Sequence, residues 1–426
     1  MSTTVQSGRD GTRGNLALGA LGLGAFVVGT AELVIVGILD LVAKDLKVSV
    51  GTAGLLVTAY ALGICIGGPL LTVLTVRLGR RVLLGITLAA FIVGNVLALS
   101  AVNFGMLVAA RVLTGSVHGL FVGVASMVAS SLVPPERRGQ AVAMVFGGIA
   151  VSTVVGVPLG TLIGQSISWQ AAFVGIVILA AIALVAVVML VPPVSAATDS
   201  GLRAQAKFAF APRVLGMLLV GLLLLGGEFA AFTYISSFLQ DVTKVSGGAV
   251  SGFVLAFGVA SAVGAIVGGR FADRNASNTL LVCNVGLVVA LVLLKLVGAS
   301  PIPVIIVLAL WGLVGFGLTP AFQLRVIGLA GPGGGLAATL GASAVNAGIA
   351  VGAAVGGWAE GGHGAGAVVV TGAIICAVGL PVTWASRFLT PPAAEPLAGS
   401  SSGVTVAAAD EGAAGLAADS AVLQAD

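Results

Sequence analysis

Apolar stretches long enough to cross a lipid bilayer recur along almost the whole chain of 426 residues. A membrane-spanning helix needs roughly 20 apolar residues. Only 8% of the residues are charged, whereas soluble domains carry about 25%, so a water-soluble fold is excluded. We predict an all-α integral membrane protein whose twelve transmembrane helices cover residues 15–42, 52–76, 82–101, 105–133, 140–164, 169–191, 214–239, 249–269, 279–299, 303–324, 335–358 and 364–385.

Basic residues are distributed unevenly between the two sets of predicted loops. Because cytoplasmic loops carry an excess of Lys and Arg, we predict a multi-pass protein of the cell membrane with both termini in the cytoplasm. Arg111 lies within a span, and the outer loops hold only Lys44, Lys47, Lys244 and Lys295. The predicted inner side holds Arg9, Arg13, Arg77, Arg80, Arg81, Arg137, Arg138, Arg203, Lys207, Arg213, Arg270, Arg274, Arg325 and Arg387.

Several classes of function are excluded by residues that the sequence lacks. The three cysteines, Cys65, Cys283 and Cys376, all lie in predicted spans and suggest no disulfide framework. His118 and His363 are too few and too scattered for a metal site. The chain has no phosphate-binding loop and no nucleophile–base constellation. We therefore predict neither an enzyme nor an ATP-driven pump, with no cofactor, no metal and no nucleic-acid partner.

Three pairs of segments repeat at nearly equal spacing. Glu228 follows Glu32 by 196 residues, Arg274 follows Arg77 by 197, and the Trp311 segment follows the Arg111 segment by 200. Chance likeness is the alternative to duplication. We predict two six-helix bundles, at 15–192 (the first half) and 214–390 (the second half), joined by a cytoplasmic linker at 193–213. A cytoplasmic tail at 1–14 and a disordered acidic tail at 391–426 complete the chain.

Short motifs in the spans carry a family resemblance. They are Gly29-Thr30-Ala31-Glu32, Ala53-Gly54-Leu55-Leu56 with Tyr60-Ala61-Leu62-Gly63, the basic loop at 77–81, the Arg111 segment, Gly147 with Gly156-Val157-Pro158-Leu159-Gly160, and Asn346-Ala347-Gly348-Ile349-Ala350. The chain resembles the major facilitator superfamily, and within it the twelve-helix drug:proton antiporters, close to chloramphenicol-resistance and arabinose-efflux permeases. The resemblance implies a monomeric transporter that exports small amphiphilic molecules in exchange for protons by alternating access.

Two alternatives to drug export stay open at this point. The same fold serves sugar or nucleobase permeases, and a membrane receptor or assembly protein could keep the fold without transporting. Charged residues within the spans speak against an inert bundle, because each is costly in hydrocarbon.

The predicted proton-coupling residues are Glu32 and Arg111. A charged side chain in the middle of a span costs about 2.5–3.5 kcal/mol on insertion scales, and burial favours the protonated form of a carboxyl group. The resemblance implies that Glu32 lies near Arg111, and an ion pair between them would favour the ionised form. The alternative is a structural pair that joins two helices.

The predicted substrate cavity combines polar and aromatic residues of both halves, namely Glu32, Glu228, Tyr60, His118, Trp311 and Asn346. Glu228 suggests a cationic or hydroxyl-rich substrate, or else a solvated carboxylate beside a helix break at Gly226-Gly227. His118 is either a proton relay or a packing residue.

Two further motifs complete the predicted site. The gating loops contain Arg77, Gly79, Arg80 and Arg81 in the first half and Gly269, Asp273 and Arg274 in the second. Thr72 and Val76 stand in the first half where the family pattern has a glycine and an aspartate, which puts the charge lock of that half in doubt. Gly147, Gly156, Pro158 and Gly160 form the predicted antiporter motif, whose small residues also suit ordinary helix packing.

Overall fold

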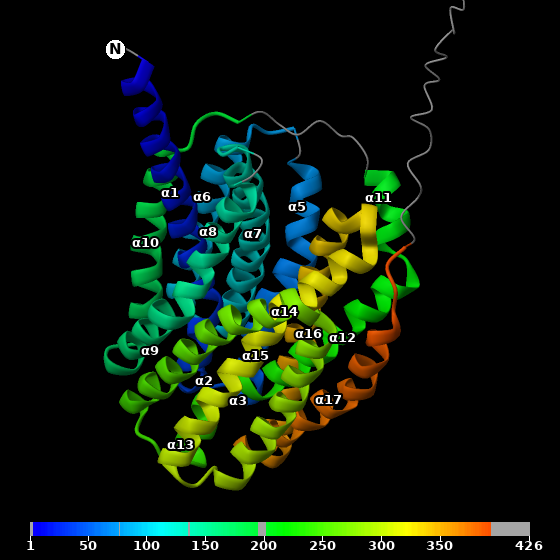
Figure 1. Ribbon diagram of the computed structural model, residues 1–426. Coiled ribbons are helices and arrows are strands. Elements are labelled where there is room, and N and C mark those ends of the chain that lie inside the picture. Colours follow the sequence, from blue (N-terminus) through cyan, green and yellow to red (C-terminus); the bar gives the residue numbers. More distant parts are fainter. Residues whose placement is uncertain (1–2, 76, 135–136, 195–201, 393–426) are drawn as a thin grey trace, which may run out of the picture. The chain divides into compact units, whose positions relative to one another are not determined.

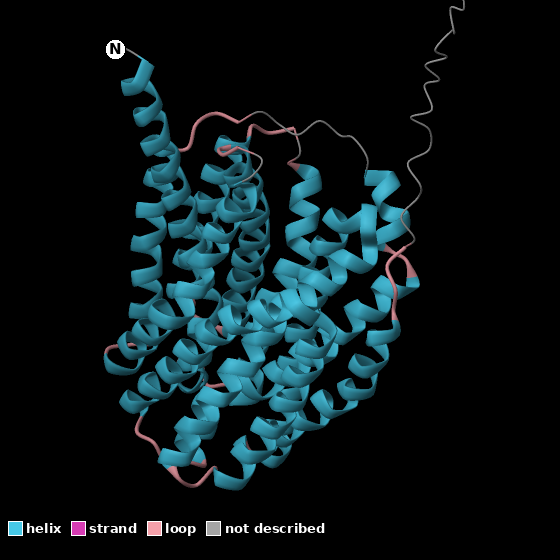
Figure 2. Cartoon of the chain, in the orientation of Figure 1, coloured by secondary structure: helices cyan, strands magenta, loops and turns pink. Residues whose placement is uncertain are grey.

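The computed structural model describes residues 3–75, 77–134, 137–194 and 202–392 (Figure 1). Val76, much of the predicted linker and nearly all of the predicted 391–426 tail lie outside these residues, as does the start of the predicted 1–14 tail. In the described ranges the chain consists of helices joined by short loops, without a strand (Figure 2).

The first half contains ten α-helices and two short π-helical segments in the described residues. They are α1 (Thr3–Gly37), α2 (Leu39–Asp45), α3 (Val50–Ala53), α4 (Leu55–Leu62), η1 (Gly63–Gly67), α5 (Gly68–Leu74), α6 (Arg80–Leu99), α7 (Phe104–Ser131), α8 (Arg138–Val151), η3 (Ser152–Gly156), α9 (Val157–Ser166) and α10 (Trp169–Leu190).

The linker region and the second half contain seven α-helices and two short 3-10 segments in the described residues. They are α11 (Leu202–Ala209), α12 (Pro212–Phe232), α13 (Ile235–Asp241), α14 (Gly247–Val297), α15 (Pro301–Ala330), η4 (Gly331–Gly333), α16 (Gly334–His363), α17 (Ala365–Ala385) and η5 (Ser386–Phe388).

Ten helical stretches of the described residues are long and apolar enough to cross a membrane, and two of them are long enough to cross twice. The stretch Gly247–Val297 has 51 residues and Pro301–His363 has 63, whereas about 20 suffice for one crossing. Each therefore accommodates two of the predicted spans, which accounts for twelve crossings.

The connection at residues 270–278 differs from the predicted loop. Residues Gly269–Arg274 stay helical within α14, and the turn is made at Asn275, whose backbone leaves the helical region at φ −157° and ψ 89°. The side chain of Asn275 accepts a hydrogen bond from the backbone N–H of Asn278 at 2.9 Å. Asn275 thus caps the next helix, so a single residue replaces the expected loop.

The first and seventh predicted spans are interrupted at equivalent places. The helix pair α1 and α2 is broken at Ile38, and the pair α12 and α13 is broken at Thr233 and Tyr234. Both bounds of α13 lie 196 residues after those of α2. Lys47 and Lys244, 197 residues apart, both adopt a positive φ, of 54° and 62°. The spacing of the sequence repeat therefore recurs in the backbone.

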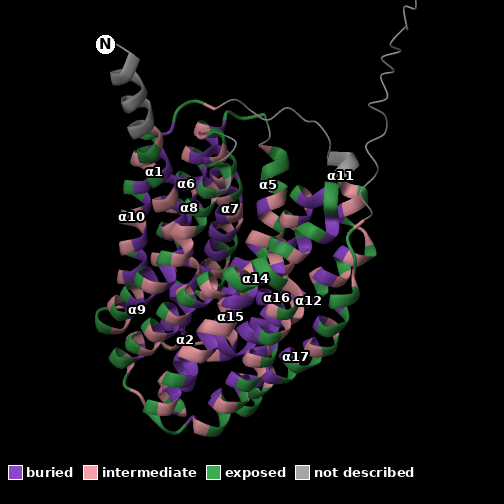
Figure 3. Cartoon of the chain, viewed as in Figure 1, coloured by how far each residue is buried: buried purple, intermediate pink, exposed green. Residues whose placement is uncertain are grey.

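From Gly14 onward most residues of α1 are buried, whereas most residues of α5 are exposed (Figure 3). Small residues on the segment from α8 to α9 allow a close approach to α1. A Cβ atom on Gly148, Gly156 or Gly160 would collide with Gly22, Thr30 or Val34 of α1, respectively.

Gly147 of the predicted antiporter motif lies outside this contact, because a Cβ atom there would meet nothing within 4 Å. The packing row runs through Gly148 instead, at intervals of four residues, which is the spacing of one helix face. Pro158 lies in the first turn of α9, directly after the π-helical segment η3.

Candidate functional site

Arg111 of α7 links three helices from a fully buried position. Its guanidinium donates to the carbonyl oxygens of Ala31 at 2.7 Å and Glu32 at 3.0 Å, both on α1. A third hydrogen bond runs from Nε to the carbonyl oxygen of Leu56 on α4, at 3.3 Å. Carbonyl oxygens can compensate a buried cation only in part, so a further source of negative potential is expected nearby.

The ring of Tyr60 on α4 supplies this negative potential, and its hydroxyl extends the hydrogen-bond network. The Cζ atom of Arg111 lies 4.0 Å from the centroid of the Tyr60 ring, in cation–π geometry. The Tyr60 hydroxyl donates to the carbonyl oxygen of Val28 at 3.2 Å and lies 3.0 Å from Nδ1 of His118. The Tyr60 hydroxyl has only one proton to donate. When it donates that proton to the carbonyl oxygen of Val28, Nδ1 of His118 is the donor in the contact with the Tyr60 oxygen.

The carboxyl group of Glu32 lies beside His118 rather than Arg111. Its Oε2 is 3.7 Å from Nδ1 of His118, and the Glu32 side chain is 21% exposed. Among the described residues, no ion pair joins the Glu32 carboxyl to the guanidinium of Arg111. In place of the suggested ion pair, the guanidinium of Arg111 binds the backbone carbonyl oxygen of Glu32 and not its carboxyl group.

The exposed part of the Glu32 side chain faces the interior of the helix bundle and not its outer surface. Every other residue from Val27 to Leu39 is buried. A helix that faced lipid at Glu32 would also expose the residues three and four positions away. Glu32 therefore borders an internal gap between helices.

Glu228 and Trp311 lie together in the second half. The carboxyl group of Glu228 on α12 packs against Gly315 of α15, where a Cβ atom would collide with it. Trp311 is one helical turn before Gly315, so its indole lies on the face of α15 that the Glu228 carboxyl group contacts. Both residues are almost completely buried. The predicted helix break at Gly226-Gly227 is wrong, because α12 continues to Phe232.

The six predicted cavity residues thus form two groups and one separate residue. Glu32, Tyr60 and His118 gather around Arg111, while Glu228 lies near Trp311. Asn346 of α16 is half-buried, and its side-chain amide donates to the carbonyl oxygen of Ala342 in its own helix at 3.0 Å.

A polar cluster that the sequence analysis missed joins the two halves at the predicted outer end. We call it the outer closure: Asp40, Gln165, Ser236 and Gln240. The carboxylate of Asp40 accepts hydrogen bonds from Ser236 at 3.0 Å and Gln240 at 2.9 Å, both on α13 of the second half. Gln165 of the first half donates to Asp40 at 3.2 Å. The sequence signal that could have revealed this cluster was Asp40, a carboxylate within the predicted first span.

Main-chain contacts reinforce this closed end. The Tyr234 hydroxyl donates to the carbonyl oxygen of Ala353 at 2.6 Å and lies 3.4 Å from that of Gly51 in the first half. Gly51 in turn approaches Gly357 of α16 so closely that a Cβ atom would collide with its carbonyl oxygen. The two halves are therefore in direct contact at the predicted outer end.

The predicted gating residues do not form a charge lock in the described part of the chain. Arg77, Gly79, Asp273 and Arg274 are exposed, and Gly269 is half-buried. No ion pair of Asp273 or Arg274 occurs among the described residues.

The basic residues of the first half instead contact the end of α10 and the chain beyond it. Arg81 donates to the carbonyl oxygen of Val188, and the backbone N–H of the buried Arg80 donates to that of Val194 at 3.0 Å. These bonds anchor the start of α6.

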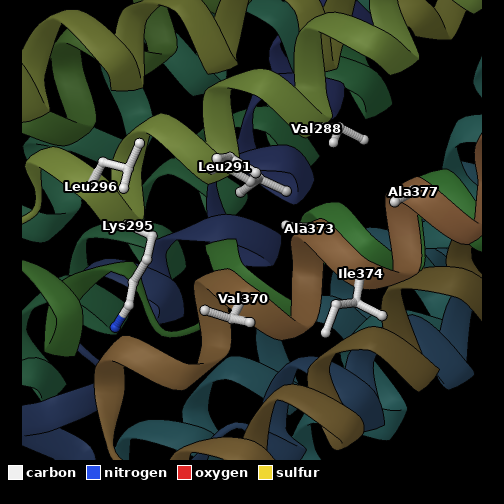
Figure 4. Close-up of a pocket in the computed structure, with 9 residues that line it drawn as sticks. Val288, Leu291, Lys295, Leu296, Val370, Ala373, Ile374 and Ala377 are labelled. Carbon is white, nitrogen blue, oxygen red and sulfur yellow. The ribbon is translucent and has the colours of Figure 1, made fainter.

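Two apolar grooves lie outside this site. One, of about 360 Å³, is lined by Leu291 and Lys295 of α14 and by Val370 and Ile374 of α17 (Figure 4). The other, of about 390 Å³, lies beside the turn at Asn275. Neither is lined by a residue of the predicted cavity. Within the described residues, no group of three His, Cys, Asp or Glu side chains could hold a metal ion.

The sequence matches the family profile described as Major Facilitator Superfamily over residues 21–341. The chain belongs to this superfamily. Over 375 residues it is 38% identical to the MFS-type transporter YtbD of Bacillus subtilis, a match that covers 84% of this chain and 94% of the relative. It is 34% identical to the inner membrane transport protein YdhP of Escherichia coli K12, covering 87% and 96%.

A third relative carries a more specific name. The chain is 32% identical to the chloramphenicol resistance protein of Streptomyces lividans, with 79% of this chain and 87% of the relative covered. These relatives confirm the family resemblance inferred from the motifs. This superfamily member is therefore a multi-pass membrane transporter for small molecules, and not an enzyme.

Solved structures confirm the predicted fold class. A D-xylose–proton symporter superimposes with a TM-score of 0.71 at 16% identity, covering 88% of this chain and 98% of the symporter. A bacterial homologue of the lysosomal transporter Spinster, in an inward-facing conformation, gives 0.69 at 13% identity, with 88% and 97% covered. At such low identity the likeness concerns the fold alone.

Proposed function

We propose that this superfamily member exports small amphiphilic molecules, of which chloramphenicol is the first to test, in exchange for protons. Glu32 is the proton carrier. The observation that carries this proposal is the position of the Glu32 carboxyl group, partly exposed to an internal gap within an otherwise buried stretch of α1. The 32% identity to the chloramphenicol resistance protein supports the substrate class.

The network around Arg111 supports a positioning role for the buried groups. By holding the carbonyl oxygens of Ala31 and Glu32, Arg111 fixes the orientation of α1 at the carrier residue. The Nδ1 atom of His118, at 3.7 Å, is too far for a direct hydrogen bond to Glu32. A small movement, or one water molecule, would let His118 redirect its Nδ1–H from the Tyr60 hydroxyl to Glu32 when Glu32 ionises.

Alternating access gives this carboxyl group its function. In our proposal Glu32 takes up a proton when the gap opens outward and releases it when the gap opens to the cytoplasm. The cytoplasmic side is the one whose predicted loops carry most of the Lys and Arg residues. One proton that crosses about 100 mV releases about 2.3 kcal/mol, which sustains a substrate ratio of about 50.

The test uses purified protein in liposomes with radiolabelled chloramphenicol and an imposed pH gradient. We expect gradient-driven uptake by the wild type and none by the Glu32→Gln variant, because glutamine cannot carry a proton. Asp241→Asn is the matched control: this carboxyl group is exposed at the end of α13, and its loss should leave uptake unchanged.

Gradient-driven uptake by Glu32→Gln at the wild-type rate would contradict the carrier role. If the wild type exchanges labelled D-xylose but none of a panel of amphiphilic drugs, export of amphiphiles is refuted and a permease function is favoured. Size-exclusion profiles show whether each variant is folded.

A further inference from the structure

Among the described residues, the carboxyl group of Glu228 has no counter-ion and makes no hydrogen bond. Both of its oxygens are buried without a partner, and so is the indole Nε1 of the adjacent Trp311. Glu228 is 1% exposed and Trp311 is fully buried. Unlike Glu32, Glu228 has no histidine or arginine of the described residues within ion-pair distance.

The elements around Glu228 offer almost nothing that titrates. Helix α15 contributes Gly315 and Trp311, and α16 approaches the neighbouring turn of α12 through Gly348 and Gly352. Helix α17 contributes the buried thiol of Cys376, which donates to the carbonyl oxygen of Leu224 at 3.7 Å.

An aromatic cluster borders this region on the side of Trp311. The ring of Phe232 stacks on that of Phe257 at a centroid distance of 4.4 Å, and both rings meet the Trp311 indole edge-on at 5.9 Å and 5.6 Å. Phe229, next to Glu228, contacts Phe232 at 5.6 Å. Water and mobile cations are thereby kept from this side of the carboxyl group.

An ionised carboxylate is strongly disfavoured in such surroundings. The transfer of an unpaired charge into an apolar interior is so unfavourable that the group takes up a proton instead. A neutral carboxylic acid can also accept from the Trp311 N–H and donate its own proton. The surroundings therefore select the protonated form without any neighbouring charge.

We infer that Glu228 and Trp311 form a second proton-binding site, occupied by a proton in the conformation described here, in which the predicted outer end is closed. The inference goes beyond the proposed function, because it holds whatever the substrate is. Together with the proposed role of Glu32, it places one proton-binding carboxyl group in each half. Exchange at Glu228 requires that the contact between α12 and α15 loosens during the cycle.

The test measures the charge state directly and needs no substrate. Infrared spectra of the purified protein in liposomes at neutral pH distinguish the C=O stretch of a carboxylic acid from the stretches of a carboxylate. We expect the difference between the wild type and Glu228→Gln to show the loss of a carboxylic-acid band. The exposed control Asp241→Asn should instead lose a carboxylate signal.

A second variant keeps the test independent of a folding defect in Glu228→Gln. Trp311→Phe removes the N–H donor, so the acid band should shift to higher frequency while Glu228 stays in place. Loss of a carboxylate band in Glu228→Gln would overturn the inference and favour Glu228 as a counter-charge for a cationic solute. An acid band that is unmoved in Trp311→Phe would exclude Trp311 from the site. Because no transport is measured, failure of the proposed export function leaves this result unaffected.

Discussion

The outer closure provides a quantitative test of alternating access. Asp40→Ala removes the two hydrogen bonds, at 3.0 Å and 2.9 Å, that tie α2 of the first half to Ser236 and Gln240 of the second. A hydrogen bond in a protein contributes about 1 kcal/mol net. Loss of both should therefore disfavour the closed outer end by about 2 kcal/mol.

That free energy corresponds to a large shift in population. At 1.4 kcal/mol per tenfold, about 2 kcal/mol changes the ratio of closed to open molecules about 30-fold. An outward-open state present at about 1% would rise to about a fifth of the molecules, which is readily detected.

The assay is pulsed electron spin resonance between two labels at the predicted outer end. Labels at Lys44→Cys and Ala249→Cys place one exposed probe on each half, in a background with the three native cysteines replaced by alanine. We expect Asp40→Ala to add a population at longer distance.

Asp45→Ala is the matched control on the same helix. The Asp45 carboxylate accepts hydrogen bonds from Trp169 at 2.8 Å and Gln170 at 3.2 Å, both within the first half. Its loss should lower the melting temperature without changing the distance distribution. If Asp40→Ala gave the wild-type distribution, or if both variants shifted it equally, the closure would not depend on Asp40.

Three more predictions test the packing of α1 and the network of Arg111. Gly156→Ala should lower the melting temperature by overpacking worth about 1–3 kcal/mol, because its Cβ atom would collide with Thr30. Arg111→Lys should abolish transport and destabilise the fold, since an ammonium group cannot hold three carbonyl oxygens on two helices in fork geometry. Tyr60→Phe should keep the cation–π contact but lose two hydroxyl bonds, worth about 1 kcal/mol each.

Each of these predictions has its own check. Gly147→Ala, at a position with open space, is the control for Gly156→Ala, and equal melting curves for the two variants would refute the packing argument. Wild-type uptake by Arg111→Lys would show that charge alone suffices. For Tyr60→Phe, the melting temperature should fall, and a melting temperature equal to that of the wild type would show that the hydroxyl bonds to Val28 and His118 contribute no stability.

Much of this fold could be predicted from the sequence, because a transmembrane helix satisfies its backbone hydrogen bonds within itself. Local hydropathy therefore revealed the spans. The spacing between Glu32 and Glu228 predicted a duplication that reappears in the bounds of α2 and α13. Burial of a carboxyl group within a span likewise identified Glu32, since its cost in hydrocarbon does not depend on the details of packing.

The partners of these residues were decided only by the tertiary structure. Whether Arg111 meets the carboxyl group or the backbone of Glu32 depends on the rotation and separation of α1 and α7, which no local pattern encodes. Helix rotation likewise decides that Gly148, and not Gly147, packs against α1. Asp40 meets Ser236 and Gln240 from 196 and 200 residues away, because contacts between the halves are set by how whole bundles dock.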